Sequence, residues 1–188
     1  GNKKRLTDFY KRFGFIDNKG KNKDFTISES MIRAPSPLVG DAAKRVYRGV
    51  SSANKRIDPN ITWFAEDEKL AKGYSDRGEV FSADLNIKNP FNAGDDKNTT
   101  TPRKFANSAL QQLGKDKVDR KTALLIKDDF LSNYPDPDKN VQVIDFWASD
   151  DGKDNVANMM EDLGFDSVRL KEEGVETYGI IRMNKPAT

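Results

Sequence analysis

Short alternations of apolar and polar residues recur along the chain, and each predicts a β-strand bounded by polar turns. Past residue 43 the clearest alternating segments are KRVYRGV, ITWFA, EVFSADLNIKNPFNAG, DSVRLKEE and ETYGIIRMN. The third is expected to form one strand that ends at Asn89-Pro90, because proline cannot donate to a strand ladder. The last two predict a hairpin, with its turn expected at Gly174-Val175.

Segments with the apolar spacing of helices lie between these strands. The predicted helices are a short one that starts near Glu66-Asp67 and runs through EKLAKGYS, two at residues 102–114 and 120–132, and DNVANMMEDLGF with its C-cap at Gly164. The segment QVIDFWAS is compatible with a short helix or a strand, with Phe146 and Trp147 buried in either case. Strands and helices interleaved in this way predict a mixed α+β domain.

The first 37 residues have a pattern of their own. Apolar residues in LTDFYKRF repeat at helical spacing, and FTISESMIRAP alternates as one strand of a hairpin. Pro35 and Pro37 then bracket a linker. This helix-hairpin is too small to bury a core alone. The sequence therefore predicts an appendage over residues 1–37 and a main domain over residues 38–188.

Composition narrows the chemistry that the chain can perform. The chain contains no Cys and no His, which excludes disulfides, thiolate or histidine metal sites, and catalytic triads that use imidazole. The net charge of +2, from 32 basic and 30 acidic residues, argues against a dedicated nucleic-acid binder. No apolar run reaches the length of a membrane span, so a cytoplasmic protein is expected. The leading Gly1 suggests a piece of a longer chain.

The acid-rich loops do not predict a metal site. Counted from Asp136, the positions where a calcium-binding EF-hand loop needs Gly and Glu are occupied by Val141 and Trp147. The basic clusters near the N-terminus have acidic neighbours and are expected to be solvated surface.

Four segments carry a resemblance to a known family. They are VYRGV at 46–50, WFAEDEKLAKGYS at 63–75, VFSADLNIKNPF at 80–91 and LGFDSVRLKEEGVETYGII at 163–181. In this order they resemble the ADP-ribosyltransferase superfamily, and closely its small phage-encoded members, including the anti-CRISPR ADP-ribosyltransferases. The resemblance covers roughly residues 44–185 and is poor over about 95–145. It implies a split β-sandwich with flanking helices and transfer of ADP-ribose from NAD⁺ to a macromolecule.

The resemblance also implies the site residues. Arg48, with the adjacent Gly49, would anchor NAD⁺, and Tyr74 with Phe64 would pack on its nicotinamide. Glu172 would be the catalytic acid, with Glu173 the adjacent alternative. These residue types suit the chemistry, because a carboxylate stabilises an oxocarbenium-like state and arginine binds phosphate.

Two departures from the family pattern bear on the function. Members that use the tyrosine usually carry His at the position of Arg48. Members that modify arginine carry Glu or Gln two residues before the catalytic Glu, where this chain has Leu170 or Lys171. An arginine acceptor is therefore less favoured. A bacterial host protein is the expected acceptor, nucleic acid stays possible, and neither a metal nor a membrane partner is expected.

Other functions stay open. The first is a non-catalytic interaction module that keeps the fold within a multi-module phage protein. The second is a nuclease or RNA-modifying enzyme that uses carboxylates. The first 37 residues resemble the C-terminus of a GNAT-type acetyltransferase, in LTDFYKRFGF and MIRAP, without its pyrophosphate loop. A structural role for this appendage is expected.

Overall fold

The computed structural model describes residues 43–113 and 118–183, and within them the fold is mixed α+β. The appendage expected over residues 1–37 lies outside the described residues. In chain order the elements are β1 (Ala43–Gly49), β2 (Ile61–Ala65), α3 (Glu68–Lys72), β3 (Val80–Asn86), β4 (Pro90–Asp95), β5 (Thr99–Thr100), α4 (Pro102–Gln112), α5 (Arg120–Leu131), β6 (Val141–Gln142), the 3₁₀ helix η1 (Val143–Trp147), α6 (Asp150–Leu163), β7 (Ser167–Glu172) and β8 (Val175–Ile181).

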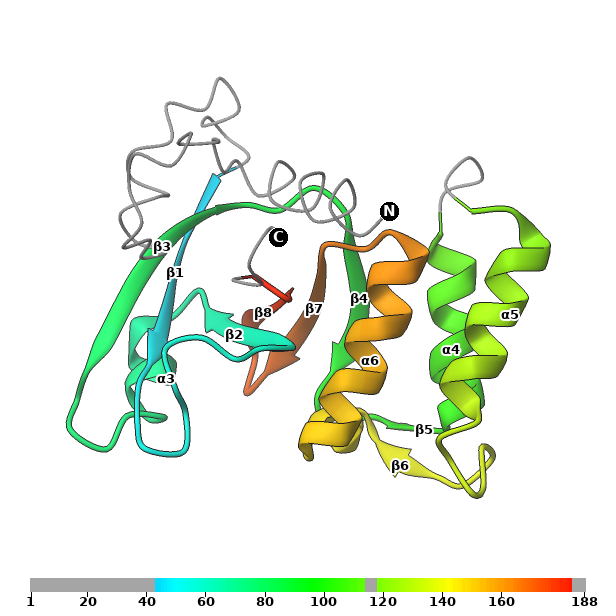
Figure 1. Ribbon diagram of the computed structural model, residues 1–188. Helices are drawn as coiled ribbons and strands as arrows, with labels where there is room; N and C mark the ends of the chain where they lie inside the picture. Colours follow the sequence, from blue (N-terminus) through cyan, green and yellow to red (C-terminus); the bar gives the residue numbers. More distant parts are fainter. Residues whose placement is uncertain (1–42, 114–117, 184–188) are drawn as a thin grey trace.

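Six of the described strands form one sheet in the order β3-β1-β2-β8-β7-β4. Neighbouring strands are antiparallel except β4 and β7, which are parallel. In Figure 1, α3 lies at the β1–β3 end of the sheet, whereas α4, α5 and α6 gather at the β4 end. The α+β class predicted from the sequence is confirmed. The described strands make one six-stranded sheet and a small β5–β6 ribbon, so two separate stacked sheets are not observed.

The alternating segment at 79–94 forms two strands instead of one. β3 and β4 lie on opposite edges of the sheet, and only residues 87–89 connect them, so the sheet must curve for this crossing to be made. The fully buried Asp166 holds this crossing, because its Oδ2 accepts hydrogen bonds from the backbone N–H groups of Lys88 and Asn89, at 2.8 and 2.9 Å. The predicted strand end at Asn89-Pro90 is therefore the start of a second strand.

The β7–β8 hairpin turns one residue earlier than predicted. Glu172 pairs with Val175, which leaves Glu173 and Gly174 as a two-residue loop. Both have positive φ, 51° and 79°, as a type I′ hairpin turn requires. Glycine adopts this conformation readily, but a glutamate there is strained.

The apolar core lies between the sheet and the helices at the β4 end. Phe105 of α4 stacks on Phe146 of η1 with ring centroids 4.1 Å apart, and both rings are buried, as is Trp147. The expected helices at 102–114 and 120–132 are α4 and α5. The third, α6, ends at Gly164, whose φ is 89°. The prediction of a left-handed glycine cap is confirmed.

The sheet is weakest between β1 and β2. Tyr47 and Ala65 form the one register pair between these strands, whereas β1 pairs with β3 along its whole length. The Arg48 side chain replaces the missing backbone bonds. Its Nη1 donates to the Trp63 carbonyl at 2.9 Å, and its Nε donates to the Lys55 carbonyl in the β1–β2 loop at 2.9 Å.

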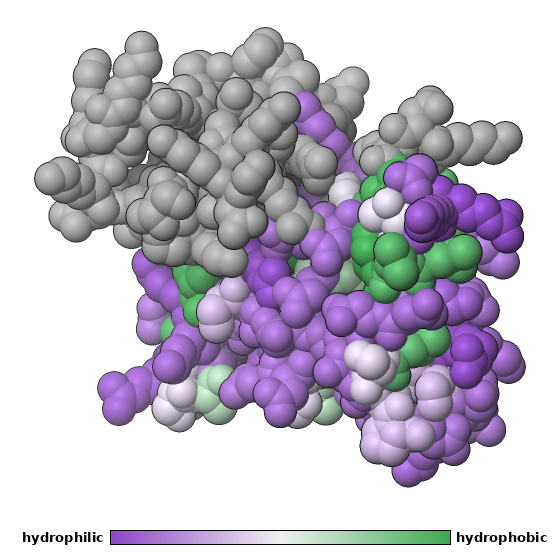
Figure 2. Space-filling view, turned by 45° about the vertical axis from the view of Figure 1, so that its right-hand side comes forward, coloured by the Kyte–Doolittle hydropathy of each residue, from purple (hydrophilic) through white to green (hydrophobic). Residues whose placement is uncertain are grey.

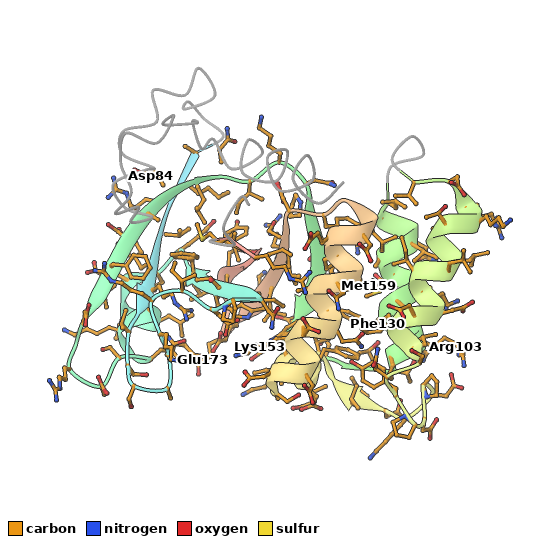
Figure 3. All side chains as sticks on the ribbon, viewed as in Figure 1. Asp84, Arg103, Phe130, Lys153, Met159 and Glu173 are labelled. Carbon is orange, nitrogen blue, oxygen red and sulfur yellow. The ribbon has the colours of Figure 1, made fainter. Side chains whose placement is uncertain are left out.

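The same loop has a second attachment further along. Asp58 accepts hydrogen bonds from the backbone N–H groups of Asn60 and Ile61, and its other oxygen lies 3.1 Å from Nζ of Lys153 in α6. Arg48 and Lys153 thus tie the β1–β2 loop to the strands and to the helix layer. Figure 3 shows Lys153 on the side of α6 that faces the sheet.

Arg48 is therefore expected to be a determinant of stability. Arg48→Lys removes the planar fork and its hydrogen bonds to the carbonyls of Lys55 and Trp63, which should lower the free energy of unfolding by about 2–3 kcal/mol in denaturant titrations. The matched control is Arg45→Lys on the same strand, where the side chain is 54 % exposed and pairs with Asp84. That change should cost less than about 0.5 kcal/mol. Equal costs for the two variants would refute the structural role.

Candidate functional site

The strand register assigns the candidate residues to two faces of the sheet. Residues directly opposite each other on paired strands share a face, and alternate residues along a strand share it too. Trp63 pairs with Gly179, which pairs with Val168, and Glu172 lies four residues beyond Val168 on β7. Trp63 and Glu172 therefore lie on one face, here called the helix face because α3 and η1 pack on it.

Gly49 of β1 allows α3 to pack closely on this face. A Cβ on Gly49 would lie 1.9 Å from the carbonyl oxygen of Ala71, so only glycine lets α3 approach β1 this closely. The helix begins at Asp67, whose carboxylate accepts the backbone N–H groups of Lys69 and Leu70. The predicted helix N-terminus is confirmed. The helix ends just before Tyr74, which it delivers to the helix face.

Tyr74 and Glu172 meet at the end of the β7–β8 hairpin. The Tyr74 hydroxyl donates a hydrogen bond to Oε1 of Glu172, although the two residues are 98 positions apart in the chain. Tyr74 is 49 % exposed, so one side of the ring remains accessible. The structure thus joins the second and last segments of the family resemblance.

Acidic groups surround this hydroxyl. Burial, followed by the hydrogen bond to Glu172 and the charges of Glu172, Glu173 and Asp96, raises the pKa of Tyr74 well above its ordinary value. Tyr74 therefore stays protonated at neutral pH and acts as a donor. The surrounding carboxylates make this end of the sheet favourable for positive charge.

Glu173 is placed by the strained turn next to this pair. Figure 3 shows its side chain at the end of the sheet on the α3 side. Non-glycine residues in left-handed conformation cost free energy and often occur at functional sites. The turn thus places the charge of Glu173 close enough to Tyr74 to contribute to the raised pKa of its hydroxyl.

Two candidate residues lie elsewhere. Tyr47 lies on the helix face, because it pairs with Ala65. Arg48 is the next residue on β1, so its side chain leaves the sheet on the opposite face and does not face Glu172. It is buried, at 5 % exposure. However, the donors that were expected to anchor NAD⁺ are held by the carbonyls of Lys55 and Trp63. Burial lowers the pKa of its guanidinium to about 10, opposed by the charge of Asp58, so Arg48 stays cationic at neutral pH.

Phe64 also belongs to the opposite face. It is 1 % exposed, and its ring meets that of Phe81 edge-on at 5.7 Å between centroids. A buried ring in this position has no free side for a nicotinamide. The expectation that Phe64 packs on the substrate is therefore corrected: it is a core residue.

Trp63 is the residue that sequence reasoning missed. Its Nε1 is buried and has no hydrogen-bond partner in the part of the chain that the structure describes. A buried donor without an acceptor is costly, and such groups call for an explanation. The indole packs against Trp147, 5.0 Å between rings, and lies over Gly179, where a Cβ would come within 2.9 Å of it. Strand alternation, which puts Trp63 and Phe64 on opposite faces, is the signal that distinguishes them.

Other site types are not seen among residues 43–113 and 118–183. No group of three or more acidic side chains there could hold a metal ion. None of the described helices is long and apolar enough to cross a membrane. A cavity of about 600 Å³ lies between α4 and α5, away from Tyr74 and Glu172.

Comparisons with known proteins add no assignment. A scan against protein-family models, a search of curated proteins and a search of solved structures find no match to this chain.

The Tyr74–Glu172 contact can be tested by titration. In a chain labelled with ¹³C at the tyrosine Cζ, we expect the Tyr74 signal to titrate above 10.0, the ordinary pKa of tyrosine. Tyr74→Phe assigns the signal. Glu172→Gln should bring the pKa down toward the ordinary value without reaching it, because burial remains the larger cause. Glu68→Gln, an exposed change on α3, should leave it unmoved. An ordinary pKa in the unaltered chain would contradict the geometry.

Proposed function

We propose that the chain transfers ADP-ribose from NAD⁺ to a macromolecular acceptor, on an ADP-ribosyltransferase-like fold. The observation that carries the proposal is the hydrogen bond between Tyr74 and Glu172. It brings a half-exposed aromatic ring and a carboxylate together from the two segments where the resemblance requires them. The single register pair between β1 and β2 is compatible with the split arrangement that the family would need.

The residues at this site suit the substrate's reactive end. The bond between ribose and nicotinamide breaks with its electron pair on nicotinamide, and positive charge develops on the ribose. Glu172 would stabilise this charge, and its carboxylate would receive the proton of the attacking acceptor group. Tyr74 fixes the orientation of Glu172 and offers its ring to nicotinamide. The Nε1 of Trp63 is a buried donor on the same face and is not assigned a contact with the substrate.

Arg48 has no direct role in this proposal. Its Nε and Nη1 are used to hold β1, β2 and their loop together. Its contribution to the reaction is to keep the sheet in the form that presents Tyr74 and Glu172. The proposed acceptor is a bacterial host protein, which the resemblance to phage-encoded enzymes suggests.

A non-catalytic module is the second candidate. It is favoured by the same engagement of Arg48, because a chain that does not bind NAD⁺ has no need of a free arginine at this position. The two functions predict different outcomes in one assay.

In that assay, the chain is incubated with labelled NAD⁺ and bacterial lysate, and transfer to protein is followed on gels and by mass spectrometry. Glu172→Gln should reduce transfer by about a hundredfold, because the charge at the reacting ribose is lost. Tyr74→Phe should reduce it less, since the ring remains.

The matched control is Glu68→Gln, which removes an exposed carboxylate from α3 and should leave transfer unchanged. Glu173→Gln separates the two adjacent acids: if it abolishes transfer and Glu172→Gln does not, the assignment of the acid is reversed. No transfer by the unaltered chain favours the non-catalytic module, and equal transfer by the unaltered chain, Glu172→Gln and Glu173→Gln contradicts a catalytic role for either acid.

A further inference from the structure

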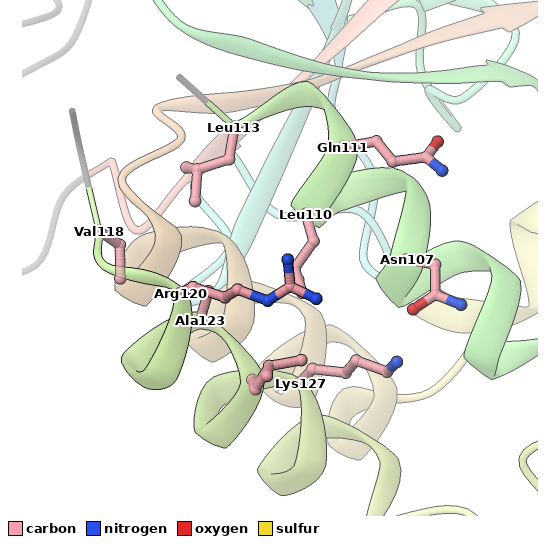
Figure 4. Close-up of a pocket in the computed structure, with 9 residues that line it drawn as sticks. Asn107, Leu110, Gln111, Leu113, Val118, Arg120, Ala123 and Lys127 are labelled. Atoms are coloured by element: carbon pink, nitrogen blue, oxygen red, sulfur yellow. The ribbon is translucent and has the colours of Figure 1, made fainter. Parts of the chain in front are cut away.

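A second site candidate lies between α4 and α5, at the other end of the molecule from Tyr74. These helices lie side by side in Figure 1, and a cavity of about 600 Å³ opens between them. The residues that line it are Asn107, Leu110, Gln111, Leu113, Val118, Arg120, Ala123, Leu124 and Lys127. All nine are drawn in Figure 4, where the Arg120 guanidinium points between the helices. We call this feature the α4–α5 groove.

The polar side chains of the groove have no partners within the described part of the chain. Arg120 and Lys127 form no ion pair there, whereas Arg45, Arg103 and Arg169 each hold a carboxylate. A cation without an acidic partner is available to an external one.

The side-chain amides that line the groove also lack hydrogen-bond partners among the described residues, unlike the amide of Gln112 outside it. The side chain of Gln112 bonds to Asn92 and Ser108, but no bond within the described residues is made by the side chains of Asn107 and Gln111, which line the groove.

Apolar side chains line the groove beside these polar ones. Leu124 of α5 lines it and is 40 % exposed, one of the few large apolar side chains exposed in the described part of the chain. Figure 2 turns this part of the molecule forward and shows apolar side chains gathered among hydrophilic ones. Exposed apolar surface rimmed by polar groups is typical of an interaction site.

We propose that the α4–α5 groove binds an acidic amphipathic helix of a partner protein. Two adjacent helices leave a groove that a third helix can fill, with its apolar residues between the two ridges. Among the described residues that line the groove there are two cations and no acid, so the charge is complementary to an acidic helix. Because Leu110, Leu113, Val118 and Leu124 also line it, an amphipathic partner fits better than a small anion.

The spacing of the cations defines the partner further. Arg120 and Lys127 are separated by two helical turns, about 10 Å along the axis of α5. Carboxylates at positions i and i+7 of a partner helix have the same separation. Apolar residues at i+3 and i+4 of that helix would then meet Leu124 and Leu110. This proposal does not depend on the transfer of ADP-ribose.

The test uses a fluorescent synthetic helix of about 18 residues with leucine on one face and glutamate beside it. Its binding to the full chain is followed by fluorescence anisotropy, and a second helix with lysine in place of glutamate serves as the charge-reversed probe. The acidic helix should bind and the basic helix should not. Arg120→Glu combined with Lys127→Glu should weaken binding by about tenfold or more, because attraction becomes repulsion. Leu124→Gln should also weaken it.

The matched control carries the same change of charge at exposed positions of α4 and α5. Lys104→Glu combined with Lys121→Glu alters exposed residues that do not line the groove, and should change binding by less than about twofold. Circular dichroism establishes that the variants are folded. Equal weakening by both double variants, or no binding of the acidic helix, overturns the proposal. Binding of octanoate or inorganic phosphate at the groove without binding of the helix also overturns it, in favour of a small-anion site.

Discussion

The Arg48 guanidinium is the interaction on which the arrangement of the sheet depends. β1 and β2 share one register pair, so backbone hydrogen bonds alone would not hold β1 and β3 to the rest of the sheet. Arg48 donates to a carbonyl of β2 and to a carbonyl of the β1–β2 loop, and its burial makes both bonds costly to lose. α3 packs on the strand that this arginine secures, and Tyr74 follows α3. The position of Tyr74 beside Glu172 is therefore a consequence of the same attachment.

The two faces of the sheet have different tasks. The opposite face contributes to stability. Phe64 packs there against Phe81, and the buried side chain of Arg48 leaves the sheet from that face. The helix face holds the hydrogen-bonded Tyr74–Glu172 pair, beside the strained Glu173, and the indole N–H of Trp63, which has no partner among the described residues. Unsatisfied or strained groups cost free energy, and their concentration on one face is the physical reason for placing the function there.

The sequence allowed the regular elements to be predicted, because strand alternation, helical spacing and caps such as Asp67 and Gly164 are local signals. It did not allow the β3–β4 crossing to be predicted, since the acceptor that holds it, Asp166, is far away in the chain. The site was anticipated in part: the Tyr74–Glu172 meeting followed from a resemblance, whereas the role of Arg48 depends on the carbonyl of Lys55, which no residue pattern reveals. Trp63 and Phe64 differ by one position, and only the pairing of the strands decides which of them shares a face with Glu172.

The central claim is that the helix face beside Glu172 binds NAD⁺ through Tyr74, and calorimetric titration of the folded chain with NAD⁺ tests it most directly. The account predicts a saturable heat of binding that Tyr74→Ser abolishes, because Tyr74 is half exposed and its loss should remove the ring without unfolding the chain. No heat from the unaltered chain, or the same heat from Tyr74→Ser, would contradict the account.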